Sequence, residues 1–345
     1  MFKRLVTAVL ATALVLPAFV GGGAVPAAAK GKSDFIDLDS VPKPKITGKE
    51  IIAGLEDFVA RYPLRQSVLA GTPVGSNIPA SEFLAKETRK LGYKTRIIEY
   101  EGEGQTGNTV RVIEAVKRGT TKPNEWIAFV AHYDTVASAG FTLEGAYDDG
   151  SGTNILRYFA KAFSKIKTKR SIAILWFDGE ETGLRGSSLY TNELPAGVKF
   201  RAAMGFDMVG IGYPAPYCIC IYHGPIDGAF AEPIIDYVNF DYLGFPEGNG
   251  GPTAAEKWPV GTEPHVCSCG PNIRNSDERN FAEKGIFSMR WTGMRTASDY
   301  PGYHQPWDTV AFMEQVAEGR ENLEMGTENT FLSAYYTTML LDALP

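Results

Sequence analysis

Short apolar runs alternate with longer amphipathic stretches along most of this chain. Trp126–Ala131 and Ile172–Phe177 are continuous apolar runs, as expected for strands buried on both faces of a sheet. The stretch between them, Ser151–Ile166, is predicted to be a helix. A strand–helix–strand order is typical of parallel sheets with helices on both sides, so the pattern predicts an α/β fold.

The alternation continues on both sides of this unit. Further strands are predicted at Lys94–Glu101, Thr109–Lys117, Ala202–Val209, Tyr217–Tyr222 and Ile286–Trp291. Further helices are predicted at Lys49–Arg61, Pro79–Leu91, Ala229–Phe240 and Thr327–Leu341. We therefore expect a three-layer α/β/α fold with a central, largely parallel mixed sheet.

The first residues have the pattern of a secretory signal peptide. A basic stretch, Met1–Arg4, precedes an apolar run over Leu5–Val20, and small residues follow at Val25–Ala29. We predict cleavage after Ala29, so that residues 1–29 are removed and the protein is secreted, extracellular or periplasmic. The alternative, a retained membrane anchor, is disfavoured because the uninterrupted apolar run is short for a bilayer.

Composition limits the remaining organisation and the partners. We expect residues 30–48 to be extended and residues 49–345 to form a single domain with a loop or lid insertion around 213–270. Tyr242–Gly270 in particular is rich in Gly, Pro and polar residues and is long for a simple connection. The formal net charge is −6, and it becomes about −8 without Lys3 and Arg4, which argues against a nucleic-acid partner.

The four cysteines form two tight pairs, Cys218-Ile-Cys220 and Cys267-Ser-Cys269. In a secreted protein such pairs predict disulfides, and a bridge within one C-x-C would need strained geometry. We therefore expect two bridges between the pairs, with the connectivity left open. The alternative is a zinc site made by the four thiols. The spacing is narrower than structural zinc sites usually have, although His265 lies nearby.

Potential metal ligands lie within the end of a predicted strand or in a segment after one, at five positions: His132, Asp148, Glu181, Asp207 and His304. One imidazole and one carboxylate for each ion, with a further carboxylate shared between them, would suit a pair of zinc ions. Glu180 is left over, and a spare carboxylate beside a metal can act as a general base. Because parallel strands end at one edge of a sheet, we expect these side chains to meet there.

Ordinary structural roles compete with these assignments. Asp148 and Asp149 could cap the helix that follows them. Glu180 and Glu181 could form a solvated strand end. Asp207 has an apolar neighbour on each side, where an unpaired charge would be costly, so a metal is its natural partner.

In combination and in order, the motifs around these residues resemble those of the secreted bacterial di-zinc aminopeptidases. That family also contains glutamate carboxypeptidase and is related to the glutaminyl cyclases. The motifs are H-x-D, D-D-G-S-G, E-E-x-G-x-x-G-S, F-D-M-x-G and Y-H-x-x-x-D-T. The resemblance runs from about Ile51 to the C-terminus and is weakest over residues 213–270.

The resemblance implies a role for each matched residue and two zinc ions per chain. The implied zinc ligands are His132 and Asp207 for one ion, Glu181 and His304 for the other, and Asp148 for both. Glu180 is implied as the general base and Tyr303 as a group that polarises the scissile carbonyl and stabilises the oxyanion. Asp134 is implied to orient His132, and Asp308 to orient His304.

One position departs from the family pattern. The family often has Ser-Asp-His before the last strand, whereas residues 276–279 read Ser-Asp-Glu-Arg. We expect Glu278 to lie near the substrate pocket, so this departure bears on substrate preference and leaves the metal ligands untouched. His223 and His265 fall outside the motifs and are expected to be ordinary structural residues.

The predicted function is a secreted zinc-dependent aminopeptidase that acts on peptides or small aminoacyl substrates. One alternative is a glutaminyl-cyclase-like aminoacyltransferase, which the resemblance implies would work with one zinc ion. The other is a non-catalytic ectodomain of the same fold. Counting bound zinc separates the first two, and a turnover assay separates both from the third.

Overall fold

A computed structural model describes most of the chain. The described residues are 35–65, 77–104, 108–136, 143–212, 218–224, 227–245, 264–273, 275–293 and 299–345. The predicted signal peptide lies outside the described residues, as do residues 213–217 and 246–263 of the predicted insertion. Within the described ranges, no helix has the length and apolar character needed to cross a membrane.

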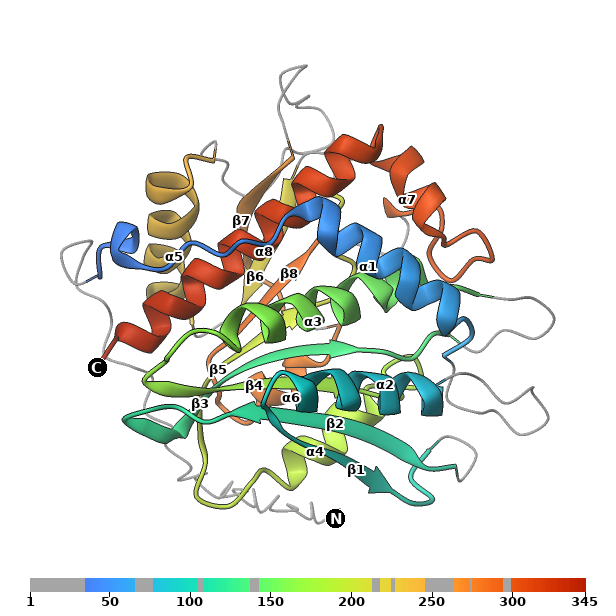
Figure 1. Cartoon of the computed structure of the whole chain (residues 1–345), viewed down its shortest axis with the longest axis horizontal. Helices are drawn as coiled ribbons and strands as arrows, with labels where there is room; N and C mark the ends of the chain where they lie inside the picture. The colour runs from blue at the N-terminus through green and yellow to red at the C-terminus, as the bar shows by residue number, and fades with distance from the viewer. Residues whose placement is uncertain are drawn as a thin grey trace, which may run out of the picture.

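A single eight-stranded sheet forms the centre of the described structure (Figure 1). Its strands, in chain order, are β1 (Lys94–Tyr100), β2 (Val110–Lys117), β3 (Lys122–His132), β4 (Arg170–Phe177), β5 (Lys199–Phe206), β6 (Cys218–His223), β7 (His265–Pro271) and β8 (Ser288–Thr292). In space the order is β1-β2-β4-β3-β5-β8-β6-β7. The predicted α/β fold with a mixed, mostly parallel sheet is confirmed.

The four central strands run in the same direction. β3 pairs in parallel with β4 and with β5, and β5 pairs in parallel with β8. The sheet becomes antiparallel on each side, where β2 meets β4 and β6 meets β8. The carboxyl ends of the four central strands therefore lie at one edge, which is where open α/β sheets bind ligands.

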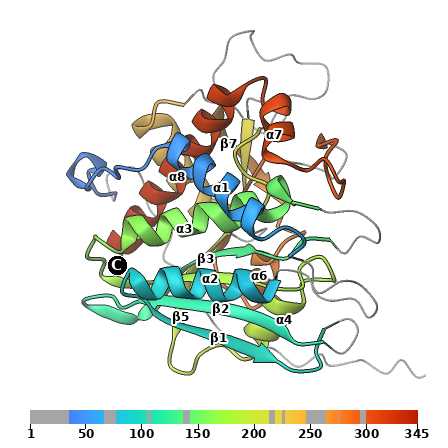
Figure 2. The same ribbon diagram turned by 45° about the vertical axis from the view of Figure 1, so that its right-hand side comes forward.

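Helices cover both faces of this sheet (Figures 1 and 2). The helices are α1 (Gly48–Arg61), α2 (Asn77–Lys90), α3 (Ser151–Phe163), α4 (Arg185–Asn192), α5 (Gly228–Ile235), α6 (Glu278–Glu283), α7 (Val310–Val316) and α8 (Arg320–Ala343). One face carries α1, α2, α3, α5 and α8, and the opposite face carries α4 and α6. Shorter helical turns lie at Leu38–Ser40, Ala146–Gly150 and Asp236–Tyr242.

Local sequence explains why these elements form. β4 is buried along its whole length, as its continuous apolar run predicts. Thr47 and Glu50 form a reciprocal capping box that starts α1. On the larger face, the Phe129 ring of β3 stacks on Phe159 of α3 at 4.4 Å between centroids, which joins the helix to the sheet.

The predicted insertion around 213–270 contributes two strands to the sheet. β6 lies close to the predicted strand Tyr217–Tyr222, but β7 occupies part of Tyr242–Gly270, which the sequence predicts to be a loop. That prediction is wrong for residues 265–270, which lie in β7. The Gly, Pro and polar content of the longer stretch masks a short strand whose apolar residues are few.

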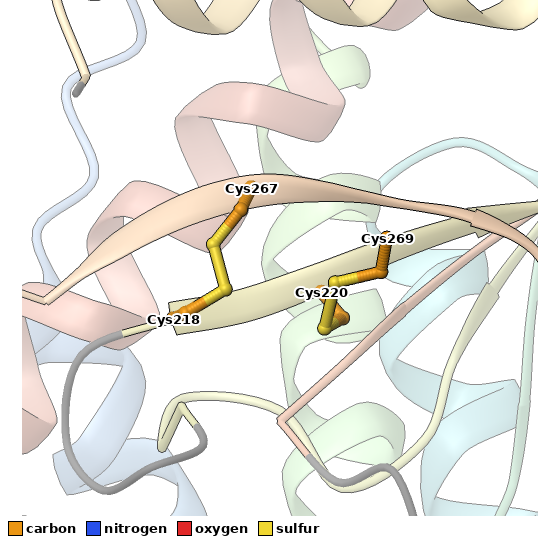
Figure 3. Close-up of a disulfide and its surroundings, with 4 residues drawn as sticks. All are labelled: Cys218, Cys220, Cys267 and Cys269. Carbon is orange, nitrogen blue, oxygen red and sulfur yellow. A yellow bond between two sulfur atoms is a disulfide. The ribbon is translucent and has the colours of Figure 1, made fainter. Parts of the chain in front are cut away.

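Two disulfides join these strands, as Figure 3 shows. Cys218 bonds to Cys267 and Cys220 to Cys269, with Cα atoms 5.9 and 5.4 Å apart. These separations lie in the usual range for disulfides. The prediction of two bridges between the pairs is confirmed, and the connectivity is now assigned.

Candidate metal centre

The strand ends bring all five predicted ligands to one place on the sheet. His132 is the last residue of β3, and its register partner on β4 is Phe177, three residues before Glu180. Asp207 directly follows β5. His304 comes from the segment after β8. The predicted meeting of these side chains at the carboxyl edge is therefore what the fold produces.

Asp148 lies between the two histidines. Its Oδ1 is 3.2 Å from His132 Nε2, and its Oδ2 is 3.3 Å from His304 Nε2. His132 Nε2 also lies 3.8 Å from Asp207 Oδ1, and His304 Nε2 lies 3.0 Å from Glu181 Oε2. One carboxylate thus faces two separate imidazole–carboxylate pairs.

These side chains form two groups with the spacing of metal ligands. One contains His132, Glu180 and Asp207, and the other contains Asp148, Glu181 and His304. Within each group the ligand atoms lie within 4.8 Å of one another. Glu180 is therefore close to the first group, and its role as a base rather than a ligand stays a prediction.

The chemistry of the centre fits divalent cations. Among the described residues, four of its buried atoms make no hydrogen bond of suitable angle, although carboxylate oxygens lie close to both imidazoles: His132 Nε2, Glu181 Oε1, Asp207 Oδ1 and His304 Nε2. Buried polar atoms are normally paired, so a missing partner calls for an explanation. Imidazole nitrogens and carboxylate oxygens are the ligands that zinc takes in catalytic sites.

The pKa shifts of the histidines point the same way. Burial would lower the pKa of His132, but the carboxylate of Glu180 and its other acidic neighbours outweigh burial and raise that pKa well above its usual value. Burial likewise opposes protonation of His304, yet Asp148 and Glu181 raise its pKa to about 10. The negative charge of these neighbouring carboxylates is stabilised by nearby cations, and bound metal ions would provide them.

The two adjacent glutamates are held by one buried side chain. Asp134 accepts hydrogen bonds from the backbone N–H of Glu180 at 3.2 Å and of Glu181 at 3.3 Å. Its Oδ1 also lies 3.4 Å from His132 Nδ1, as expected for a carboxylate that orients a metal-binding histidine. Burial raises the pKa of Glu180 well above its usual value and that of Glu181 to about 7.

Asp308 is placed differently from the expectation. Its carboxylate accepts hydrogen bonds from the backbone N–H groups of Tyr147 at 2.9 Å and Asp148 at 3.1 Å, and from the Tyr300 hydroxyl at 2.9 Å. These contacts fix Asp148. The expected role of orienting His304 therefore stays a prediction.

Tyr303 stacks directly on His304, with ring centroids 3.7 Å apart. Burial raises the pKa of its hydroxyl, and the nearby carboxylates of Asp148 and Glu181 raise it further. The phenol therefore stays protonated and able to donate a hydrogen bond. His304 itself adopts φ of 55°, a conformation that is rare for non-glycine residues and that concentrates at functional sites.

Glu278, the position that departs from the family pattern, packs against the strand that leads to Asp207. It is fully buried at the start of α6, where a Cβ on Gly205 of β5 would collide with its carboxylate. Arg290 Nε of β8 lies 3.7 Å from its Oε1. The expectation that it lies near the substrate pocket stays a prediction.

Some residues of the centre were not predicted as functional. Arg65 is fully buried beside the segments that carry the candidate ligands His132 and Asp148, and nothing in its local sequence distinguishes it. Asp149, expected near the helix cap, accepts a hydrogen bond from Gly152 N–H at 2.8 Å and another from Met208 N–H at 3.3 Å. It thereby ties the Asp148 turn to the residue after Asp207.

The remaining histidines lie apart from the two groups of ligands. His223 ends β6, and its Nε2 is 3.7 Å from Glu232 Oε1. His265 begins β7 and is buried. Neither joins the groups with metal-ligand spacing found among the described residues.

Known proteins resemble this chain in sequence. The aminopeptidase YwaD of Bacillus subtilis is 28% identical over 208 residues, which is 59% of this chain and 41% of that protein. Leupeptin-inactivating enzyme 1 of Streptomyces exfoliatus is 31% identical over 248 residues, which is 70% of this chain and 52% of that protein. The chain thus spans about half the length, or less, of these curated relatives.

Solved structures share the fold. A zinc aminopeptidase from Bacillus subtilis superposes with a TM-score of 0.63 at 14% identity, covering 85% of this chain and 96% of that one. A glutaminyl cyclase from Porphyromonas gingivalis gives a TM-score of 0.62 at 19% identity, covering 85% of this chain and 99% of that one. The sequence model of peptidase family M28 matches residues 111–321. This range makes up more than half of the chain and contains every candidate ligand. The chain belongs to peptidase family M28.

Proposed function

We propose that this protein is a zinc-dependent aminopeptidase that removes amino-terminal residues from peptides and binds two zinc ions. The observation that carries the proposal is the placement of Asp148 between His132 and His304, at 3.2 and 3.3 Å. A carboxylate with one oxygen toward each imidazole is suited to two ions. The aminopeptidases among the relatives support the reaction class.

The residues of the centre divide the work of hydrolysis. Bound zinc ions would supply Lewis acidity that polarises the scissile carbonyl and acidifies water. Glu180 accepts a proton from the attacking water and passes it to the leaving amine, so that the C–N bond breaks without releasing an unprotonated amide anion. Tyr303 donates a hydrogen bond to the oxygen that becomes negative during attack.

A transferase resembling the glutaminyl cyclases is the second candidate, because such an enzyme shares the fold. The presence of two complete groups of ligands favours the peptidase. Secretion belongs to the proposal as well: residues 1–29 would be removed, and the amino-terminal residue of the exported protein would be Lys30.

A panel of aminoacyl p-nitroanilides tests the proposed function, assayed with and without a chelator. We expect release of nitroaniline from substrates with a free amino group, loss of activity with the chelator, and about two zinc ions per chain by elemental analysis. The matched N-acetylated substrates should not be cleaved. Cyclisation of amino-terminal glutamine by a protein with one zinc ion would instead establish the transferase.

A further inference from the structure

We propose that Arg65 is a positioning residue that holds two metal-binding segments of the chain at a fixed separation. We define these as the His132 segment (residues 132–135) and the Asp148 segment (residues 143–148). The inference rests on the metal-binding part of the proposed function and does not depend on the reaction. It concerns a side chain outside every matched motif.

The Arg65 guanidinium bonds to both segments at once. Its Nε donates to the carbonyl of Tyr133 at 2.7 Å, directly after His132. Its Nη1 donates to the carbonyl of Glu144 at 2.7 Å, and its Nη2 donates to that of Gly145 at 2.9 Å. One rigid, planar group therefore spans the two segments.

The guanidinium is itself anchored to α1. Its Nη1 also donates to the carbonyl of Tyr62 at 3.0 Å, and its Cζ lies 5.2 Å from the centroid of the Phe58 ring. The backbone N–H of Leu64 donates to the carbonyl of Leu143 at 3.0 Å. The end of α1 thus forms a fixed support from which the side chain reaches both segments.

The two segments touch where Arg65 holds them. A Cβ on Gly145 would collide with the side chain of Thr135, and it would lie 3.3 Å from Arg65 Nη2. Gly145 also has φ of 53°, which glycine adopts without strain. Such close packing leaves little room for either segment to shift, provided that the guanidinium keeps its contacts.

The charge of Arg65 is buried without an ion pair among the described residues. The side chain is 0% exposed, and its four described acceptors are backbone carbonyls. Burial lowers its pKa to about 10, against the opposing effect of Asp149, Asp308, Asp134 and Asp148, so it stays protonated at neutral pH. Its cation therefore contributes to the balance of negative charge around the centre.

Arg170 supplies a matched control at the opposite end of the sheet. It is also 0% exposed and donates to the backbone carbonyls of Leu341, Asp342 and Leu344 from β4's first residue, and unlike Arg65 it also pairs with a carboxylate, Glu125 Oε2, at 2.7 Å. Replacing Arg170 removes a buried guanidinium that binds backbone carbonyls. It leaves every contact to the metal-binding segments in place. Loss of general stability can thereby be separated from loss of positioning.

The test measures zinc affinity by competition with a chromophoric chelator, and the thermal midpoint of the metal-free protein. The variants are Arg65→Lys, Arg65→Met and Arg170→Met, compared with the unmodified chain. We expect Arg65→Met to weaken zinc binding about 10- to 100-fold, as changes in residues that support metal ligands commonly do. Arg65→Lys should weaken it less, since one ammonium keeps the charge but cannot reproduce the fork.

Arg170→Met should lower the midpoint of the metal-free protein and leave zinc affinity within about twofold. Removing a nearby positive charge would by itself tighten cation binding, so weaker binding in Arg65→Met reports lost positioning. Unchanged or tighter zinc binding in both Arg65 variants would overturn the inference, as would an equal loss in Arg170→Met. If Arg65→Met does not fold, Arg65→Lys is compared with Arg170→Lys in the same way. An unmodified chain that binds zinc but cleaves no aminoacyl amide overturns the proposed function alone.

Discussion

We propose different tasks for the two adjacent glutamates that follow β4, Glu180 and Glu181. Glu181 Oε2 lies 3.0 Å from His304 Nε2, whereas Glu180 belongs to the group around His132 and Asp207. Both are fixed through their backbone N–H groups by Asp134. Because one anchor holds both, a change in either side chain should leave the other in place.

We predict that Glu180→Gln and Glu181→Gln lose activity for different reasons, the first through proton transfer and the second through zinc binding. The first variant keeps size and hydrogen bonding but cannot accept a proton, so kcat should fall about 10²–10⁴-fold with zinc content nearly unchanged. The second should lose affinity at one zinc position and regain part of its activity in excess zinc. Metal content and turnover are measured side by side. Loss of a zinc ion from Glu180→Gln, or near-normal turnover of that variant, would contradict the assignment of Glu180 as the base and Glu181 as the ligand.

Sequence predicts the residues of the centre only where their side chains carry the chemistry. His132, Asp148 and Asp207 can be identified because metal ligation limits residue type and spacing. Arg65 could not be identified, because its acceptors are backbone carbonyls, which every residue possesses. Nor could the full burial of Glu278 be predicted, because a charged residue gives no sign that it will be buried.

At the level of secondary-structure elements, two disulfides join β6 to β7. Each disulfide joins residues separated by 49 positions, so either bridge closes nearly the same loop of the unfolded chain. When one bridge is removed, the other therefore still imposes most of the loss of entropy on the unfolded chain.

We predict that the two bridges stabilise the protein non-additively. Cys220→Ser with Cys269→Ser should cost under about 1 kcal/mol of unfolding free energy, and so should Cys218→Ser with Cys267→Ser. Removing all four thiols should cost about 2–4 kcal/mol more than either pair. Denaturant unfolding measures these values, and thiol titration of the unmodified unfolded chain should find no free thiol. Additive losses, or titratable thiols, would contradict this account.

Elements differ in how well the sequence predicts them. Elements such as α1 and β4 are predicted at nearly their observed bounds, because burial imposes a periodic or continuously apolar pattern. The helix α8 is predicted only over Thr327–Leu341, whereas it spans Arg320–Ala343. The short helices α4, α6 and α7 are missed. They span six to eight residues, about two turns, which is too few for a repeat to be recognised.

At the scale of the molecule, metal binding and folding are linked. The ligands converge from separate strand ends, so the unfolded chain cannot bring them together, and bound zinc should stabilise only the folded form. At free zinc 100-fold above Kd, this linkage contributes about 2.7 kcal/mol per site.

We therefore predict that a chelator lowers the thermal midpoint by roughly 5–10 °C, from the usual conversion of free energy to Tm. Adding zinc back should restore the midpoint. In Asp148→Asn, which alters the carboxylate between the two histidines, the shift should be much smaller. An unchanged midpoint on chelation of the unmodified protein would show that zinc does not bind the folded chain at this centre. Scanning calorimetry supplies the measurement.

The division of the sheet into a chemical edge and a packed interior has an evolutionary consequence. The candidate ligands project from strand ends, while the apolar side chains that stabilise the fold lie within the strands and under the helices. Selection can therefore alter the loops that meet a substrate without disturbing what keeps the protein folded. Two solved structures with 14–19% identity to this chain still share its fold, with TM-scores of 0.62 and 0.63. Proteins with this arrangement can acquire new substrates through changes in the loops at the carboxyl edge of the sheet, while the packed interior stays the same.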